Sequence, residues 1–374
     1  MKILIAGDFV PRNRLATFVT KGIYSAVFGE VRDVIDNVDY AIINFESPIV
    51  ENSDTPINKC GPNLKCTADA VKAIKYAGFK CATLANNHIR DFGDSAVART
   101  IKVFNENGLD CVGVGENLAT AARILYRNIN NNTLAIINCC EHEFSIASER
   151  HYGANPLNPV SQYYSIREAR EIADYVLVIV HGGHEHYQLP SPRMQDTYRF
   201  FVDAGADIVV NHHQHCYSGF EYYNNKPIVY GTGNFCMDKY PIRINQNWNY
   251  GYMVIWDTDS ANTIKILPYN QCGEEPTVHL LDSTVFDKQL EYLNRIITDR
   301  KLLEKETNSY YDSCIPVINS VIEPFNNKYI SFLRGRHLFP SFVSQKWLLK
   351  LHDYILCESH RDKLSHFFKN INDN

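Results

Sequence analysis

The sequence has no long hydrophobic run and no excess of basic residues, and each absence excludes a class of protein. No segment approaches the roughly 20 apolar residues that a bilayer demands, so we expect no transmembrane segment. Lys and Arg number 37 against 42 for Asp and Glu, which gives a net charge of −5. This balance is unsuited to holding a phosphate backbone, so we expect no nucleic acid as a partner.

The start of the chain lacks the pattern of a secretory signal. Such a signal needs an apolar run of about 7–15 residues before its cleavage site. Here the run from Ile3 to Ala6 ends at Gly7-Asp8, which is typical of a first strand. We therefore interpret the 11 cysteines, which include no C-x-x-C pair, as reduced thiols of a cytoplasmic protein.

Several common enzyme motifs are absent as well. The sequence contains no G-x-x-x-x-G-K-[ST] loop and no glycine triplet of the dinucleotide-binding kind. It contains no G-x-S-x-G, the nucleophile motif of α/β-hydrolases. His184-Glu185 does not begin H-E-x-x-H, because position 188 is Gln. Nucleotide-driven ligation and serine-hydrolase chemistry are thus unsupported.

The pattern of apolar residues predicts an α/β domain followed by a helical extension. Up to about residue 257, short apolar runs alternate with amphipathic stretches, and after about residue 275 helical spacing dominates. We therefore expect one domain over residues 1–270 and a helical C-terminal extension over 275–374. The predicted strands cover residues 2–6, 40–43, 80–84, 133–139, 176–180, 207–210 and 228–230, with a hairpin at 253–256 and 263–267; the predicted helices include 68–77, 95–107, 165–174, 287–300 and 346–356.

Polar side chains follow six of these strands at the point where each strand ends. In an open α/β sheet, the carboxyl ends of the strands form the crevice in which ligands bind. Six of the 14 histidines also lie within the 35 residues from His181 to His215. Clustered carboxylates, carboxamides and imidazoles are costly unless something pairs with them, and divalent cations would do so. The strand-end residues are Asp8, Asn44, Glu46, Asn86, Asn87, His88, His181, the run from Asn211 to His215, and Asn234.

Some of these residues have a simpler interpretation when taken alone. Asp8 could cap a helix, and Asn87-His88 could form a turn around a core histidine. His213 and His215 are harder to explain in this way, because alternate residues of an extended segment point to the same side. Taken together at successive strand ends, these residues favour a metal centre.

Six motifs, in order along residues 1–257, resemble those of a known family. They resemble the bacterial capsule-synthesis (CapA, poly-γ-glutamate) family, which is similar to the calcineurin-like metallophosphoesterases. The resemblance implies a four-layer α-β-β-α sandwich with a two-metal site on the loops after the strands, and it does not cover the helical extension. The motifs are GDF at 7–9, NFESPI at 44–49, LANNHIRDFG at 84–93, HGGHEHY at 181–187, GADIVVNHHQHCYSGFE at 205–221 and YGTGNF at 230–235.

The resemblance also implies a ligand set for two divalent metal ions, which could be Mn, Fe or Zn. Two cations about 3.5–4 Å apart can activate water and clamp the transferred group. In this family Glu46 would bridge the two ions. Asp8 and His215 would bind the first ion, and Asn87, His181 and His213 would bind the second.

Three further residues are implied in catalysis. His88 matches the superfamily's catalytic histidine, placed to protonate a leaving group or to stabilise the developing charge. Asp91 would influence the pKa of His88 in the direction opposite to that of the metals. Glu185 falls where the family has a glutamate after H-x-G, and we interpret it as facing the substrate or supporting the metal ligands.

The sequence departs from the wider superfamily at the first metal. The superfamily begins D-x-H, but Asp8 is followed by Phe9-Val10, so the first ion lacks a histidine from this strand. Three possibilities remain open for that position: water, another residue such as His184 or His212, or no ligand.

These observations lead to one functional hypothesis and two alternatives. We expect a metal-dependent hydrolase, most readily of phosphoester bonds, linked to surface-polymer (capsule) biosynthesis and acting on an anionic small molecule or polymer. The first alternative is an enzyme or assembly factor for the amide bonds of poly-γ-glutamate. The second is a scaffold that binds a polyanion or a partner without catalysis, which the missing histidine of the first metal would fit.

Overall fold

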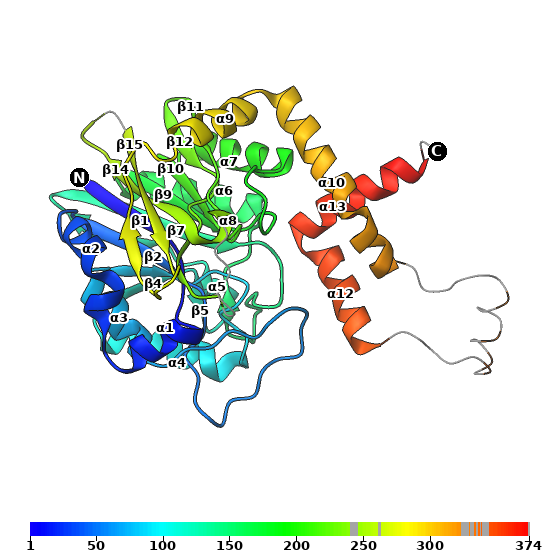
Figure 1. The fold of residues 1–374 in the computed structure, drawn as a ribbon, viewed down its shortest axis with the longest axis horizontal. Coiled ribbons are helices and arrows are strands. Elements are labelled where there is room, and N and C mark those ends of the chain that lie inside the picture. The colour runs from blue at the N-terminus through cyan, green and yellow to red at the C-terminus, as the bar shows by residue number, and fades with distance from the viewer. Residues whose placement is uncertain are drawn as a thin grey trace.

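The computed structural model describes residues 1–239, 246–260, 263–322 and 344–372, with single positions at 329, 333, 336 and 338. In this part of the chain two β-sheets pack face to face, and helices cover both outer faces (Figure 1). This arrangement confirms the predicted four-layer α-β-β-α sandwich with a helical C-terminal region.

The first sheet is formed by strands from both ends of the α/β region. Its order is β16-β15-β14-β1-β2-β3-β4, with β13 also paired to β1. Strands β1 to β4 and β13 run parallel to one another, whereas β14, β15 and β16 pair in antiparallel fashion. The strands are β1 (Lys2–Val10), β2 (Tyr40–Phe45), β3 (Cys81–Thr83), β4 (Asp110–Val112), β13 (Asn234–Met237), β14 (Tyr250–Asp257), β15 (Thr263–Gln271) and β16 (Val278–Leu280).

The second sheet has the order β11-β12-β10-β9-β7-β6, with four parallel strands at its centre. Two hairpins close its edges, and each turns on an Asn-Asn pair with positive φ, at Asn130-Asn131 and Asn224-Asn225. The strands are β6 (Leu125–Ile129), β7 (Asn132–Cys140), β9 (Tyr175–His181), β10 (Ile208–His212), β11 (Phe220–Tyr223) and β12 (Lys226–Val229); β5 (Val114–Gly115) and β8 (Gly153–Ala154) pair separately.

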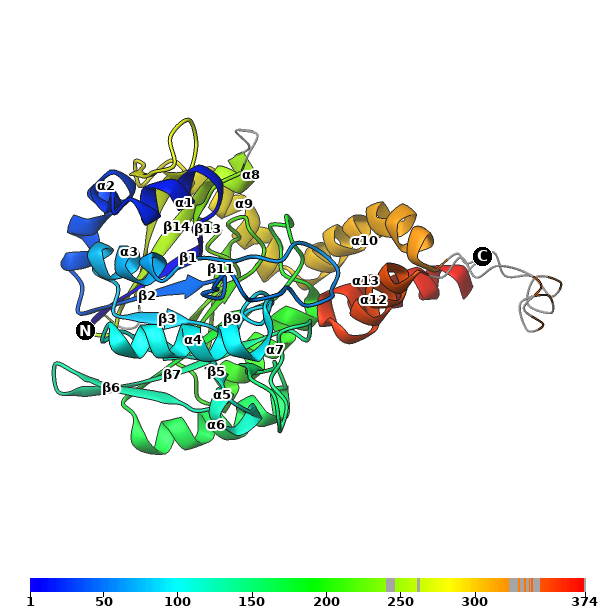
Figure 2. The same ribbon diagram turned by 90° about the horizontal axis from the view of Figure 1, so that it is seen from below.

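Alternating side chains of β1 show how the layers are built. Ile3 and Ile5 lie in the core between the two sheets, together with residues of β7 and β9. Leu4 and Ala6 point the other way, into a second core formed with the outer helices. The outer helices are α1 (Asn13–Thr20), α2 (Tyr24–Asp36), α3 (Asp69–Ala77) and α4 (Gly93–Glu106) on the first sheet, and α6 (Pro159–Ile172) and α7 (Pro192–Ala204) on the second (Figure 2); α5 (Leu118–Ala121) and α8 (Gln246–Asn249) are short.

The C-terminal region begins with β16, which completes the first sheet, and continues as helices. The apolar side of α9 packs against β11 at the edge of the second sheet, and residues such as Leu293 and Ile297 join the core of that sheet. The helix predicted over 287–300 ends at Thr298, because the Asp299 side chain accepts bonds from the first amides of the next helix. The helices are α9 (Asp287–Thr298), α10 (Arg300–Ile322), α12 (Gln345–Leu356) and α13 (Glu358–Asn372); the last three project from the sandwich (Figure 1).

The sequence predicts no transmembrane segment. Over the ranges of the chain given above, none of the helices is at once long enough and apolar enough to cross a bilayer.

Candidate metal centre

The register of the two sheets brings the polar strand ends together. In the first sheet Asp8 lies beside Asn44 of β2 and Asn234 of β13. In the second sheet His181 at the end of β9 lies between Cys140 of β7 and His212 of β10. Because the strands that carry them run parallel, these residues lie at the same end of each sheet.

Gly7 and an irregularity in β1 set the position of Asp8. The pairing register of β1 shifts around Asp8 against both β2 and β13, and such a bulge re-aims a side chain. A Cβ atom on Gly7 would lie 1.9 Å from the carbonyl oxygen of Gly233. Only glycine permits this close approach of the two strands. The Asp8 amide donates to the same Gly233 carbonyl at 3.2 Å.

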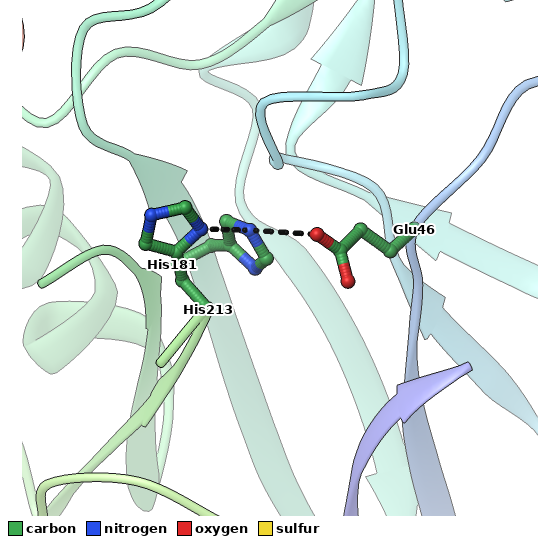
Figure 3. Close-up of side chains that lie close together, drawn as sticks. All are labelled: Glu46, His181 and His213. Atoms are coloured by element: carbon green, nitrogen blue, oxygen red, sulfur yellow. Dashed lines mark hydrogen bonds and ion pairs between the residues drawn. The ribbon is translucent and has the colours of Figure 1, made fainter. Parts of the chain in front are cut away.

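The structure brings all six predicted metal ligands together. The candidate donor atoms form three groups, and inside each group the atoms lie within 4.8 Å of one another. Glu46 belongs to two of these groups. The Asn87 Oδ1 atom lies 3.1 Å from His181 Nε2 and so joins the group of His181. The groups are Asp8, Glu46 and His215; Glu46, His181 and His213 (Figure 3); and Glu185, His213 and His215.

Glu46 is fully buried, and its charge is poorly compensated by the protein. Among the described residues, neither of its carboxylate oxygens has a hydrogen-bond partner, and His181 Nε2 lies 3.5 Å from Oε1 (Figure 3). Burial, and then the nearby charge of Asp8, raises the pKa of Glu46 well above its usual range. A divalent cation at this position would compensate the carboxylate, so the donor set fits a metal ion.

The second group of donors is formed by imidazoles that stay neutral. His213 Nδ1 lies 3.1 Å from His181 Nε2, and burial, followed by the charge of His213, lowers the pKa of His181 well below its usual range. Neutral imidazole is the form that binds metal ions. His213 and His215 also have positive φ values of 91° and 55°, a strained conformation that concentrates at functional sites.

The first group is held by carboxamides. Asn44 Nδ2 donates to Asp8 Oδ1 at 2.7 Å, and Asn234 Oδ1 lies 3.0 Å from His215 Nδ1. Burial lowers the pKa of His215, but the carboxylates of Glu46 and Asp8 outweigh it and raise that pKa to about 10. Burial likewise opposes ionisation of Asp8, and its contact with His215 holds the pKa of Asp8 below its usual range.

The predicted catalytic residues lie beside this centre. His88 Nδ1 contacts Asp91 Oδ2 at 2.7 Å, and both side chains are buried. Lys59 ion-pairs with Asp91 and places its ammonium nitrogen 3.1 Å from His88 Nδ1. Burial is the main cause that lowers the pKa of His88 to about 4, with Lys59 acting in the same direction and Asp91 against it. Glu185 is exposed and reaches the donor atoms of His213 and His215.

The two histidines considered for the first ion are not in these groups. Among the described residues His184 and His212 belong to none of the three donor sets. His184 Nε2 instead lies 3.0 Å from the Tyr311 hydroxyl on α10. Both ring nitrogens of His212 are buried and lack a hydrogen-bond partner in the described part of the chain. The first group therefore offers Asp8, Glu46 and His215 as its protein ligands.

Two residues of the site were missed by the sequence analysis. Glu143 accepts a bond from Asn87 Nδ2 at 3.1 Å, and its Oε1 lies 3.7 Å from His213 Nε2. It follows β7 as the other site residues follow their strands, so the strand-end rule could have found it. Lys59 lies in the loop between β2 and α3, where no pattern distinguishes it from other loop residues.

Comparison with known proteins gives a consistent family match. A family model described as bacterial capsule synthesis protein PGA_cap matches residues 2–239. The capsule biosynthesis protein CapA of Bacillus anthracis is 34% identical over 247 residues, which are 64% of this chain and 60% of that protein. The PGA biosynthesis protein CapA of Bacillus subtilis (strain 168) is 32% identical over 217 residues, 57% of each chain. The match therefore spans less than two thirds of these relatives.

Solved structures are similar only at a distance. A hypothetical protein from Thermus thermophilus has a TM-score of 0.46 at 13% identity, over 75% of this chain and 100% of that one. A putative 5'-nucleotidase from Staphylococcus aureus has a TM-score of 0.45 at 15% identity, over 80% of this chain and 58% of that one. Both scores are too low to bear on the activity.

Proposed function

The chain belongs to the bacterial capsule synthesis protein family, and we propose that it is a metal-dependent hydrolase of phosphoester bonds that acts in surface-polymer biosynthesis. The observation that carries this proposal is the buried Glu46, whose two oxygens lack hydrogen-bond partners in the described part of the chain and which is shared by two groups of donor atoms. A role in holding two cations would account for both the burial of Glu46 and its position between the two groups.

The candidate residues would have separate roles in metal binding and in proton transfer. Asp8 and His215 would hold one ion, and Asn87, His181 and His213 the other. Bound divalent cations supply Lewis-acid activation of water and of the phosphoryl oxygens. His88, whose ring is fixed by Asp91 through Nδ1, would exchange a proton with the leaving group through Nε2.

The charge of the site favours an anionic substrate only when the site holds cations. The carboxylates of Asp8, Glu46, Glu143 and Glu185 surround the donor atoms, and the ammonium group of Lys59 is already paired with Asp91. Bound cations would add the positive charge that attracts a phosphoester to this site. We therefore expect activity to depend on added metal.

A second candidate function comes from the names of the relatives. The protein from Bacillus subtilis is described as a PGA biosynthesis protein, and a protein from Mycobacterium tuberculosis (strain ATCC 25618 / H37Rv), 26% identical over 261 residues, as a probable polyglutamine synthesis accessory protein. Polarisation of a carbonyl at the same centre would serve an amide bond of such a polymer.

Metal analysis combined with a substrate panel tests both candidates. The full chain is analysed for bound metal, then assayed with Mn²⁺ against aryl phosphomonoesters, aryl phosphodiesters and γ-glutamyl oligomers. The proposal predicts bound transition metal and phosphoester cleavage that a chelator removes. Cleavage of γ-glutamyl oligomers alone would favour the second candidate. Protein that binds less than one equivalent of metal and cleaves none of these substrates would overturn both.

A further inference from the structure

One short loop connects the metal centre to the C-terminal helices. Residues Glu141, His142 and Glu143 follow β7 directly, between the ends of the central strands and helix α13. Figure 1 shows α10, α12 and α13 standing beside the sandwich rather than on an outer face of a sheet. The loop after β7 thus connects these helices to the candidate metal ligands.

On the metal side, Glu143 supports two of the candidate ligands. Its Oε2 accepts a bond from Asn87 Nδ2 at 3.1 Å, which leaves the Asn87 Oδ1 atom facing His181 at 3.1 Å. Its Oε1 lies 3.7 Å from His213 Nε2, while Nδ1 of the same ring lies 3.1 Å from His181. Carboxylates in this position orient the ligand atoms that bind a metal ion.

On the helix side, Glu358 at the start of α13 holds His142 by two bonds. One oxygen accepts from the His142 backbone amide at 2.8 Å, and the other lies 2.6 Å from His142 Nδ1. Both bonds join Glu358 to His142, so Glu358 fixes the backbone and the side chain of His142 together. Glu143 is the next residue, so any shift of His142 moves the carboxylate that contacts Asn87 and His213.

Glu141 adds a second link between the same elements. Its side chain is buried and accepts bonds from the Gly183 amide at 3.2 Å, from Arg193 at 2.7 Å and from the Ser359 hydroxyl of α13. A Cβ atom on Gly182 would lie 2.7 Å from the Glu141 Cγ atom, so the loop after β9 passes closely over this carboxylate. The strand that ends in His181 is thereby tied to α13 as well.

We propose that Glu358 is a positioning residue for the His181/His213 half of the metal centre, acting through His142 on Glu143. This inference rests on the proposed metal centre, and it assigns to the C-terminal helices a role in metal binding. Glu358 lies outside residues 2–239, the part that matches the family model, whereas His142 and Glu143 lie within it. Loss of a group that is bonded directly to a ligand typically lowers metal affinity about 10- to 100-fold, and Glu358, which acts through two further residues, should fall at the lower end of this range.

The test compares Glu358→Gln with a matched variant elsewhere in the same helices. Gln keeps the size of the side chain and can still accept the backbone bond, but it loses the charged contact with Nδ1. Asp312→Asn is the control, because the Asp312 side chain is 56% exposed and lies 2.8 Å from His366, so it joins α10 to α13. Mn²⁺ binding to the full chain is measured by calorimetry, and folding by the thermal midpoint.

The proposal predicts a site-selective effect. Glu358→Gln should weaken one class of Mn²⁺ site roughly tenfold and leave the other within about twofold, and Asp312→Asn should change neither. Should Glu358→Gln fail to fold, His142→Gln removes only the ring contact and should weaken the same site about threefold. Equal weakening of both sites, or of neither, by a folded variant overturns the positioning role. A wild-type chain that binds no Mn²⁺ instead overturns the proposed function itself.

Discussion

The two halves of the candidate metal centre are held in different ways. Asp8 and His215 are fixed by Asn44 and Asn234, and these two carboxamides come from strands next to β1 in the first sheet. In the other half, Asn87 and His213 contact Glu143, a carboxylate on a loop that α13 holds from outside the sandwich, while His181 Nδ1 lies 3.2 Å from Asn44 Nδ2.

This difference separates what the sandwich provides from what the C-terminal helices add. The first half needs the parallel strands, their register and the loop after β10 that carries His215. The second half also needs a contact between residues 216 positions apart in the chain, His142 and Glu358. We therefore expect the first half to tolerate changes in the helical region and the second half to respond to them.

The largest effect is expected at Glu46, the residue that the two halves share. Glu46→Gln keeps the shape but removes the charge that compensates two cations, so both halves should lose metal. A loss of about 4 kcal/mol of transition-state stabilisation corresponds to a fall of about 10³-fold in kcat/KM. Metal content and phosphodiesterase kinetics measure this prediction. Loss of a single ion would show that Glu46 does not bridge the halves.

A smaller effect is expected at His88, which lies beside both halves and in neither. His88→Gln should retain both ions and lower kcat about 10²-fold, because general acid–base catalysis typically contributes this much. The loss should shrink for substrates whose leaving group is a weak base. If the variant loses metal instead, His88 acts as a ligand and the division into two halves is incomplete.

One variant from each half tests whether the two halves are held independently. Asn234→Ala should weaken the Asp8/His215 site about tenfold, and Glu143→Gln the His181/His213 site by a similar factor, because each residue orients a ligand. Calorimetry with Mn²⁺ on both variants measures the two affinities. A double variant should show both losses together. If each single variant weakens both sites, the halves are not independently held.

The smallest effect concerns stability and depends on pH. Glu358 raises the pKa of His142 above its ordinary value, against burial and Arg361 and with a contribution from Glu141. A raised histidine pKa stabilises the fold fully below about pH 6.5, and this stabilisation is lost as pH rises through the raised pKa. The His142 side chain is 36% exposed, so the pair contributes no more than about 1 kcal/mol.

Glu358→Gln should therefore lower the free energy of unfolding more at about pH 6 than at about pH 9. Denaturant titrations of the wild type and the variant at both pH values measure this difference. An equal loss at both values would mean that the charge of His142 contributes nothing to the contact.

The sequence predicted which polar residues lie together because a single rule governs their positions. Asp8, Glu46, Asn87 and His181 each follow an apolar run, and parallel strands bring such positions to one edge. The rule was less accurate for strand ends. β1 was expected to stop at Ala6, but it continues to Val10 because β13 pairs with it beyond Asp8.

The supports of the ligands were harder to predict. Glu143 obeys the strand-end rule and was overlooked. Lys59 and Glu358 reach the site from a loop and from a helix far along the chain, and no local pattern indicates a contact at such a separation. The cytoplasmic location, which was inferred from the start of the chain, stays a prediction.

In the proposed metal centre, two metal ions share one buried carboxylate, Glu46. Anomalous diffraction from crystals of the full chain soaked in Mn²⁺ tests it most directly. We expect one peak on each side of Glu46, the first against Asp8 and His215 and the second against Asn87, His181 and His213. A fully soaked crystal with no peak at Glu46, or with a single peak there, would contradict this arrangement.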